Sequence, residues 1–245
     1  MPVITSNEID LVRNALDQAH EILVITGAGI SAESGITTFR GEGGWWRNYK
    51  AEEMATLKAF QQDPKKIWEW YDERRQAVAR AEPNNAHRTL AEWETKGKNV
   101  FIITQNVDDL HECAGSTNVV HIHGFIWEMR CMNDGKVFTD KQVPLPELPP
   151  SCPECGGLLR PNIVWFDEEL PDREVERIEA YFRQKKPDII FAIGTEATFD
   201  YIRDYALRAR REDSLLVEVN PDVTKLTPSA NVHLAARAGE ILPLL

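Results

Sequence analysis

The sequence of 245 residues has no apolar run long enough to cross a bilayer, and its first residues lack the basic-then-apolar pattern of a secretion signal. These absences predict a cytoplasmic protein that does not enter a membrane. Basic residues are also scarce, because 28 Lys and Arg stand against 39 Asp and Glu, which gives a net charge of −11. Such an acidic chain is a poor partner for nucleic acid and for anionic membrane surfaces.

Cysteine is rare as well, with four in the chain: Cys113, Cys131, Cys152 and Cys155. In a reducing compartment, a close pair of cysteines indicates a metal or redox site before it indicates a disulfide. The remaining composition is that of an ordinary globular protein, and the chain is long enough to bury a substantial core.

Strand-like apolar runs alternate with helical patterns along most of the chain, beginning with an amphipathic helix over residues 6–20. The runs lie at residues 22–26, 100–104, 119–122, 188–194 and 215–219. Alternation of this kind predicts an α/β fold with a Rossmann-like, doubly wound parallel sheet. Two stretches break the pattern. Residues 41–82 are helical and rich in Trp, and residues 125–161 hold three of the four cysteines, so together they predict a smaller second lobe.

The first predicted strand ends in Gly27-Ala28-Gly29. Glycines at this point let the backbone turn tightly and approach a ligand, and a helix that follows would favour a phosphate. The third glycine of the dinucleotide fingerprint is Ala32 here. The glycines alone therefore leave a phosphate site and an ordinary tight turn equally open.

The longer string GAGISAESGITTFRG, residues 27–41, resembles the NAD-binding signature of the sirtuins, which are NAD-dependent protein lysine deacylases. Similar strings follow in the family's order: PNNAHRTL at 83–90, TQNVDDLH at 104–111, HIHG at 121–124, IVWFDEELP at 163–171 and EVNPDVT at 218–224. The resemblance implies one catalytic domain over residues 1–245. Its Rossmann-like lobe would comprise 1–40, 83–124 and 162–245. The small lobe would comprise a helical insertion, 41–82, and a zinc module, 125–161, with the active site in the cleft between the lobes.

The resemblance also implies which residues hold NAD. They are Gly27, Ala28, Gly29, Ser31, Phe39, Arg40, Gln105, Asn106, Asp108, Gly194, Thr195, Asn220 and Ala238. Phe39 and Arg40 would lie on a loop over the cofactor. From the residues alone, Asp108 is equally suited to cap the next helix.

The family places its catalytic histidine directly before a glycine, which selects His123. Histidine can accept and return a proton near neutral pH. The resemblance implies that His123 is the general base for a ribose hydroxyl, and that the products are free lysine, nicotinamide and O-acyl-ADP-ribose.

Tyr71 and Arg74 are three residues apart on a predicted helix, residues 67–80, and so share a face. A phenol and a guanidinium together suit a carboxylate, although a core Tyr beside a surface Arg is the commoner reason for this spacing. In sirtuins, Tyr-x-x-Arg marks the enzymes that remove succinyl, malonyl and glutaryl groups. The resemblance implies that Tyr71 and Arg74 bind the acyl carboxylate and that the small Ala55 widens the pocket. It assigns the segment of Val164, Trp165 and Phe166 to pairing with the substrate peptide.

Cys152 and Cys155 form a CxxC pair, and zinc in structural sites takes four ligands. The sirtuin module uses two such pairs, but here Cys131 is followed by Asp134 where the second cysteine is expected. We expect one zinc per chain, held by Cys131, Cys152, Cys155 and Asp134. The alternative is a module that has lost its metal.

Two departures concern the ligands. Asp167 stands where the family has Gly, and Glu196 replaces a hydroxyl near the NAD phosphates, which a carboxylate would repel. The preferred interpretation is a desuccinylase and demalonylase with weaker deacetylase activity, acting on acyl-lysine proteins. The alternatives are an NAD hydrolase or ADP-ribosyltransferase, and a catalytically weak NAD-binding relative. The sequence leaves the oligomeric state open, with a monomer as one option.

Overall fold

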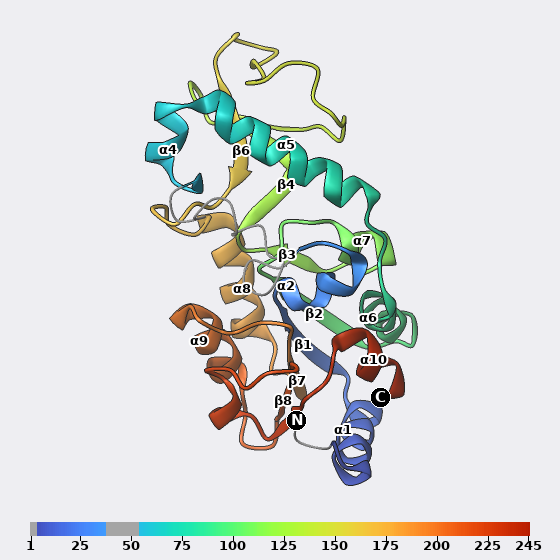
Figure 1. Cartoon of the computed structure of the whole chain (residues 1–245). Coiled ribbons are helices and arrows are strands. Elements are labelled where there is room, and N and C mark those ends of the chain that lie inside the picture. The colour runs from blue at the N-terminus through green and yellow to red at the C-terminus, as the bar shows by residue number, and fades with distance from the viewer. Residues whose placement is uncertain (1–3, 38–53) are drawn as a thin grey trace.

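The computed structural model describes residues 4–37 and 54–245, and these form two β-sheets (Figure 1). The larger sheet has the strand order β3-β2-β1-β7-β8-β9, and all of its neighbouring strands are parallel. The strands are β1 (Glu21–Thr26), β2 (Asn99–Thr104), β3 (Val119–His121), β7 (Ile189–Ile193), β8 (Leu215–Val219) and β9 (Val232–Leu234). The order reverses between β1 and β7, as in a Rossmann-like sheet, so the predicted fold class is confirmed.

The strands of this sheet are apolar throughout because both faces are covered. Ile22 and Val24 of β1 belong to one hydrophobic cluster, whereas Leu23 and Ile25 belong to another on the opposite face. β9 was not predicted, because its three residues include the polar His233 and form too short a run to be recognised.

Helices cover the two faces of the large sheet (Figure 1). One face carries α1 (Ser6–Gln18), α6 (Asn85–Thr95) and α10 (Ala238–Ile241), which continues as the 3-10 helix η4 (Leu242–Leu244). The other face carries α8 (Asp172–Gln184) and α9 (Asp200–Ala209). Shorter helices lie in the connections: α2 (Ala28–Ser31), η1 (Ala32–Ser34), α7 (Leu110–Ala114) and η3 (Thr227–Ser229).

The smaller sheet is antiparallel, with the strand order β5-β4-β6, and lies in the upper part of Figure 1 with two helices. Its elements are β4 (Gly124–Cys131), β5 (Val137–Thr139), β6 (Leu159–Ile163), α4 (Leu57–Gln62) and α5 (Pro64–Arg80). They share a third hydrophobic cluster. The division into lobes, with small-lobe insertions over residues 41–82 and 125–161, stays a prediction.

Buried hydrogen-bond donors on helix α5 hold the helix against the small sheet. The Trp68 indole N–H donates to the carbonyl of Leu159 at 2.8 Å, and the Arg75 guanidinium donates to the carbonyl of Ile126 at 2.9 Å. Arg75 is 1% exposed and also reaches the carbonyl of Asp140. Asp63 caps the first turn by accepting the Lys66 N–H. Side chains on the remaining face of α5 are therefore held in fixed positions.

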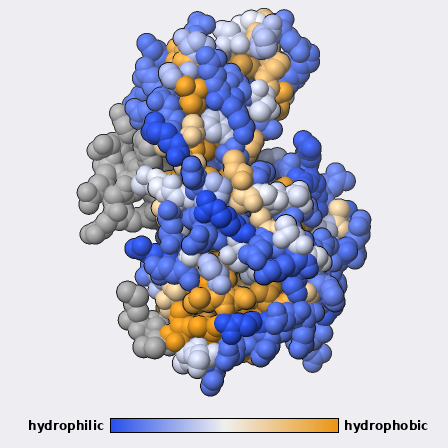
Figure 2. Space-filling model, turned by 90° about the vertical axis from the view of Figure 1, so that its right-hand side faces the viewer, coloured by the Kyte–Doolittle hydropathy of each residue, from blue (hydrophilic) through white to orange (hydrophobic). Residues whose placement is uncertain are grey.

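Figure 2 shows the side of the molecule that lies to the right in Figure 1. Hydrophilic residues cover most of this side, in keeping with the 27% of charged residues in the sequence, and hydrophobic residues gather in its lower part. Within residues 4–37 and 54–245, no helix is both long and apolar enough to cross a membrane.

Three glycines meet where the sheet order reverses. The Gly29 N–H donates to the carbonyl of Gly194 at 2.9 Å, and Gly194 has a φ of 59°. A Cβ atom on Gly194 would lie 2.5 Å from the Ile30 nitrogen, and one on Gly27 would lie 2.8 Å from the Gly194 oxygen. Glycine is the one residue that tolerates both this approach and this backbone conformation.

We therefore expect Gly194→Ala to lower the free energy of unfolding by about 3 kcal/mol or more, since overpacking adds to the strain of a left-handed backbone. Gly97→Ala is the matched control, because Gly97 has a φ of 86° but no atom within 4 Å of the position that an added Cβ would take, and we expect a loss of about 1 kcal/mol. Urea unfolding measures both variants. Equal losses of unfolding free energy in the two variants would show that the close contact at Gly194 does not affect stability.

Candidate active site

A cavity of about 1720 Å³ lies at the carboxyl ends of β1, β2, β7 and β8 and extends to α5. In a sheet of this order, ligands bind at this edge, next to the reversal. The cavity brings together most of the predicted site residues: Gly27, Ala28, Gly29, Ala55, Tyr71, Arg74, Gln105, Asn106, His123, Val164, Trp165, Phe166, Gly194, Thr195, Asn220 and Ala238.

Two predicted NAD-site residues among those that the structure describes do not line it. Ser31 and Asp108 lie behind the cavity wall, where both are buried. Phe39 and Arg40 lie outside the described residues. The roles of all the NAD-site residues stay predictions, although the structure shows how most of them are placed.

The glycine loop lines the cavity with its backbone and carries no bulky side chain there. Gly27, Ala28 and Gly29 follow β1, and α2 is a single turn that continues as η1. A helix this short has a weak dipole, and the N–H groups of Gly27 and Gly29 already donate to the carbonyls of Ile193 and Gly194. The phosphate argument therefore depends on the close approach that glycine permits. This cradle of small residues fits the pyrophosphate of NAD.

Behind the cavity, a chain of hydrogen bonds holds Asn106 in position. The Asn106 amide donates to the carbonyl of Gly27 and to the Ser31 hydroxyl, both at 3.1 Å. Ser31 donates to Asp108 at 3.0 Å, and Asp108 also accepts the Leu110 N–H at 3.2 Å. Asp108 thus accepts the first N–H of α7, whose N-cap position is Asp109, and orients Asn106 through Ser31. Burial raises the pKa of Asp108 to about 6, although its hydrogen bonds act to lower it.

Gln105 connects the second strand to the loop after β7. Its amide donates to the Thr195 hydroxyl at 2.8 Å and to the carbonyl of Thr26 at 3.1 Å. The Asn220 amide donates to the carbonyl of Thr195 at 3.1 Å. The predicted ligand residues of β1, β2, β7 and β8 are thereby linked to one another before any ligand is present.

His123 lies in the turn between β3 and β4 and faces the cavity. Its Nδ1 atom lies 3.0 Å from the carbonyl oxygen of Gln105, which can only accept, so Nδ1 carries the hydrogen. Burial lowers the pKa of His123 to about 4, although the bond to Gln105 acts to raise it. His123 is therefore neutral at pH 7, with an acceptor lone pair on Nε2. His121 instead pairs with Glu112 at 2.7 Å.

Tyr71 and Arg74 both line the cavity, as the resemblance to the sirtuins implies. The Tyr71 oxygen accepts the Trp165 indole N–H at 2.9 Å. The Arg74 guanidinium lies 5.0 Å from the centre of the Trp70 ring and 5.4 Å from that of Tyr71. Burial lowers the pKa of Arg74, and burial raises that of Tyr71.

The segment after β6 connects this pocket to His123. The Val164 N–H donates to the carbonyl of His123 at 2.9 Å, and the Phe166 N–H donates to the carbonyl of Ala55 at 3.0 Å. Asp167 accepts the Leu57 N–H with both oxygens, at 3.0 and 3.1 Å, so its carboxylate fastens α4. A substrate strand along this segment would meet carbonyl oxygens, because the amide hydrogens of Val164 and Phe166 are already used.

Trp70, Phe199 and Tyr201 are among the cavity residues that the sequence did not single out. Trp70 was assigned to the helical core, although its four-residue spacing from Arg74 could have placed it beside the guanidinium. Phe199 and Tyr201 lie in a stretch that departs from the sirtuin pattern, so no motif indicated them. Glu196 lines the cavity, and the Thr198 hydroxyl lies 3.5 Å from its carboxylate. Its effect on NAD binding stays a prediction.

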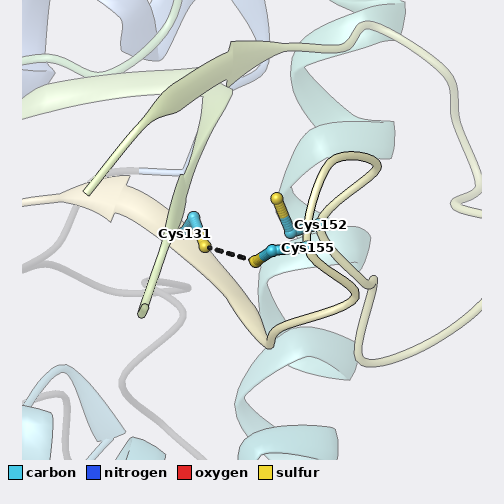
Figure 3. A group of neighbouring side chains, drawn as sticks. All are labelled: Cys131, Cys152 and Cys155. Carbon is cyan, nitrogen blue, oxygen red and sulfur yellow. Dashed lines mark hydrogen bonds between the residues drawn. The ribbon is translucent and has the colours of Figure 1, made fainter. Parts of the chain in front are cut away.

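Three thiols gather at the far end of the small sheet (Figure 3). The sulfur atoms of Cys131, Cys152 and Cys155 all lie within 4.8 Å of one another, and those of Cys131 and Cys155 are 3.6 Å apart. Thiolates on a tetrahedral zinc ion lie about 3.8 Å apart, given zinc–sulfur bonds of about 2.3 Å. The group therefore fits zinc, with Cys131 from the end of β4 and the other two from one loop.

Asp134 is not among the residues whose ligand atoms all lie within 4.8 Å of one another, so its place as the fourth ligand stays a prediction. Its place in the chain nevertheless matches that of Cys155. The Lys136 N–H donates to Asp134 at 3.0 Å, as the Gly157 N–H donates to the Cys155 sulfur at 3.4 Å. The two turns share one backbone pattern.

Family models, curated proteins and solved structures all match the chain to the same family. The family model described as the Sir2 family matches residues 27–200. Among curated proteins, the NAD-dependent protein deacylase of Aquifex aeolicus (strain VF5) is 44% identical over 217 residues, which is 89% of this chain and 90% of that protein.

Solved structures are similar over almost the whole chain. A Sir2 homologue in complex with NAD has a TM-score of 0.89 and 41% identity, covering 96% of this chain and 91% of that one. A Sir2 protein with a deacetylated p53 peptide and 3′-O-acetyl ADP-ribose has a TM-score of 0.85 and 28% identity, covering 96% of each chain.

The thiol group predicts a dependence on zinc. We expect Cys155→Ser to bind far less zinc than the wild type and to melt roughly 5–10 °C lower, because structural zinc contributes to folding. Cys113→Ser is the control, since Cys113 lies on α7 and outside the group. Metal analysis and thermal melting measure both. Equal zinc content in the two variants would contradict the assignment.

The raised pKa of Asp108 predicts the pH dependence of stability. Because the folded state holds this proton more tightly, the folded protein loses about 3 kcal/mol as the pH rises from below 3.8 to above about 6. We expect the free energy of unfolding of Asp108→Asn, relative to the wild type, to increase between pH 4 and pH 8.

Asp109→Asn is the matched control for this measurement. Burial acts to raise the pKa of Asp109, but the hydrogen bond from the Lys141 ammonium at 2.6 Å and its positive charge lower it overall. Its contribution is therefore present above its unfolded pKa and lost as the pH falls, so Asp109→Asn should lose more stability at pH 8 than at pH 4. Parallel pH profiles for the two variants would refute the assignment for Asp108.

Proposed function

The chain belongs to the Sir2 family and is an NAD-dependent protein deacylase, and we propose that it acts best on lysines whose acyl group ends in a carboxylate. The roles given below to individual residues, including the NAD-contacting roles of the glycine loop, Gln105, Asn106 and Asn220, are part of this proposal. The observation that carries it is the hydrogen-bonded phenol of Tyr71 beside the guanidinium of Arg74.

The Tyr71 phenol is set up as a donor. Its oxygen accepts the Trp165 indole N–H at 2.9 Å, which fixes the position of the ring and directs the phenol's own hydrogen elsewhere. Both rings are about 1% exposed, so the geometry is rigid. Burial raises the pKa of Tyr71, so that the phenol keeps its hydrogen at working pH. A carboxylate that enters the cavity would meet a positioned O–H donor.

Arg74 adds the positive charge. The guanidinium lies against the Trp70 and Tyr71 rings, and the rings shield it from water. A cation in such a setting gains more from an entering carboxylate than an exposed one does, because the local dielectric is lower. Arg also presents a planar fork of donors that matches both carboxylate oxygens.

Ala55 provides the room. Its carbonyl is bonded to the Phe166 N–H, so its small side chain is held on the cavity wall where a larger one would narrow the pocket. The neutral acetyl group would leave Tyr71 and Arg74 without an anionic partner from the substrate. This difference supports a preference for succinyl or malonyl over acetyl.

The chemistry requires a base next to the bound ribose. NAD, when bound, supplies the ribose carbon that receives the acyl oxygen and the nicotinamide that departs. His123 is neutral at pH 7, its Nδ1–H is held by the Gln105 carbonyl, and Nε2 is free of a hydrogen and able to take up a proton. Gln105 and Asn106 are held beside it by their bonds to Thr195 and Gly27.

We expect Arg74→Met to lower kcat/KM for a succinyl-lysine peptide by about 10–100-fold, the equivalent of losing charge-assisted hydrogen bonds of about 1.5–3 kcal/mol. For the matching acetyl-lysine peptide we expect a change of less than about 3-fold, since that substrate makes no use of the charge. Mass-spectrometric turnover with NAD measures both peptides.

Arg80→Met is the control, because Arg80 is exposed at the end of the same helix. An equal loss on both peptides for Arg74→Met would reject the carboxylate pocket. His123→Ala should abolish both activities. Turnover of NAD without deacylation in the wild type would instead indicate an NAD hydrolase or ADP-ribosyltransferase.

A further inference from the structure

The acceptor atom of the predicted base already has a partner. Tyr201 Oη lies 2.5 Å from His123 Nε2. Since the His123 hydrogen is on Nδ1, facing the Gln105 carbonyl, Nε2 has only a lone pair to offer and the Tyr201 hydroxyl is the donor. A substrate hydroxyl therefore cannot give its proton directly to Nε2 while Tyr201 is in this position.

The Tyr201 ring is held in place by its surroundings. It lies in the first turn of α9, stacks on Phe199 with ring centres 5.4 Å apart, and contacts Tyr205 with ring centres 6.2 Å apart. Arg203, on the same helix, donates to the carbonyl of Ala197 at 2.7 Å and so braces the preceding loop. Ala197 has a φ of 49°, a left-handed conformation that costs energy in a residue other than glycine.

We propose that Tyr201 is a second catalytic residue, through which the proton of the attacking substrate hydroxyl reaches His123. This inference rests on the proposed deacylase function. Tyr201 lines the cavity, and its oxygen still has lone pairs to accept a hydrogen from the substrate.

The proton balance is simple. The substrate O–H bond breaks and its hydrogen forms a bond to Tyr201 Oη, while the Tyr201 O–H bond breaks and that hydrogen forms a bond to His123 Nε2. The substrate oxygen keeps its electron pair and attacks, the phenol is restored, and His123 becomes an imidazolium. Return of the proton along the same path resets both residues.

The resting protonation states of His123 and Tyr201 agree with this order of proton transfers. Burial lowers the pKa of His123, and burial raises the pKa of Tyr201, so both groups rest in their neutral forms. A neutral phenol is able to give and receive a proton in one step, whereas a phenolate could only receive one. The titratable side chains that face His123 from α9 are Tyr201 and, behind it, Tyr205.

The test compares Tyr201→Phe with Tyr205→Phe in the full chain, with NAD and a succinyl-lysine peptide. Phe keeps the stacking on Phe199 and removes only the hydroxyl. We expect kcat for deacylation by Tyr201→Phe to fall about 100-fold, in the range that acid–base groups supply, with the KM for NAD changed by less than about 3-fold. Tyr205→Phe should stay within about 2-fold of the wild type.

Two further readouts separate a proton path from a structural role. Nicotinamide exchange, which reports on cleavage of the nicotinamide–ribose bond alone, should stay within about 3-fold of the wild type in Tyr201→Phe. The dependence of kcat on the deuterium content of the solvent should be curved in the wild type, as two protons move together, and linear in the variant.

Other outcomes overturn the inference. Unchanged deacylation by Tyr201→Phe would show that the hydroxyl is not on the path. Faster deacylation, or a lower KM for NAD, would show that Tyr201 blocks the base and must move aside. A combined loss of deacylation and exchange would indicate a structural role. If the wild type itself fails to deacylate, the proposed function fails first, independently of Tyr201.

Discussion

The site depends on one contact between two backbones. Gly29 and Gly194 approach so closely that an added Cβ on either would lie within 3 Å of the other's backbone, and the Gly29 N–H donates to the Gly194 carbonyl. This contact joins the ends of β1 and β7, the two strands between which the sheet order reverses. Gln105 and Asn220 then attach their own strands to Thr195, so four strand ends are assembled around one point. Ligand chemistry at this edge follows from that assembly.

The proposed acyl pocket and the proposed base are connected through a single segment. Val164 forms a hydrogen bond with the backbone of His123, Trp165 with Tyr71, and Phe166 with the backbone of Ala55. Three successive residues thus set the positions of His123, Tyr71 and Ala55. A substitution of Tyr71 or Ala55 would therefore act on a framework that also holds the turn of His123.

The sequence predicted those features that depend on residues close together in the chain. Local spacing placed Tyr71 and Arg74 on one helix face and revealed the glycine turn and the CxxC pair, but their assignment to a pocket, an NAD site and a zinc module came from the resemblance to the sirtuins. The long apolar strands follow from burial on both faces. It did not predict β9, which is short and contains His233. The fourth zinc ligand, Asp134, stays a prediction, because the reach of a carboxylate to three thiols depends on folded geometry. The Tyr201 contact could not be predicted, because His123 and Tyr201 are distant in the sequence and no family motif joins them.

The position of β1 in the sheet has a consequence for synthesis on the ribosome. β1 pairs on one side with β2 and on the other side with β7. Ile22 therefore pairs with Ile189, which is synthesised much later. The centre of the sheet is therefore completed only after most of the chain has been translated, and until then the apolar edge of β1 is uncovered. Pairing across so many residues is slow and leaves strand edges exposed. During rapid translation or heat stress, the nascent chain would therefore depend on chaperones, because β1 emerges early and its partner strand β7 emerges late.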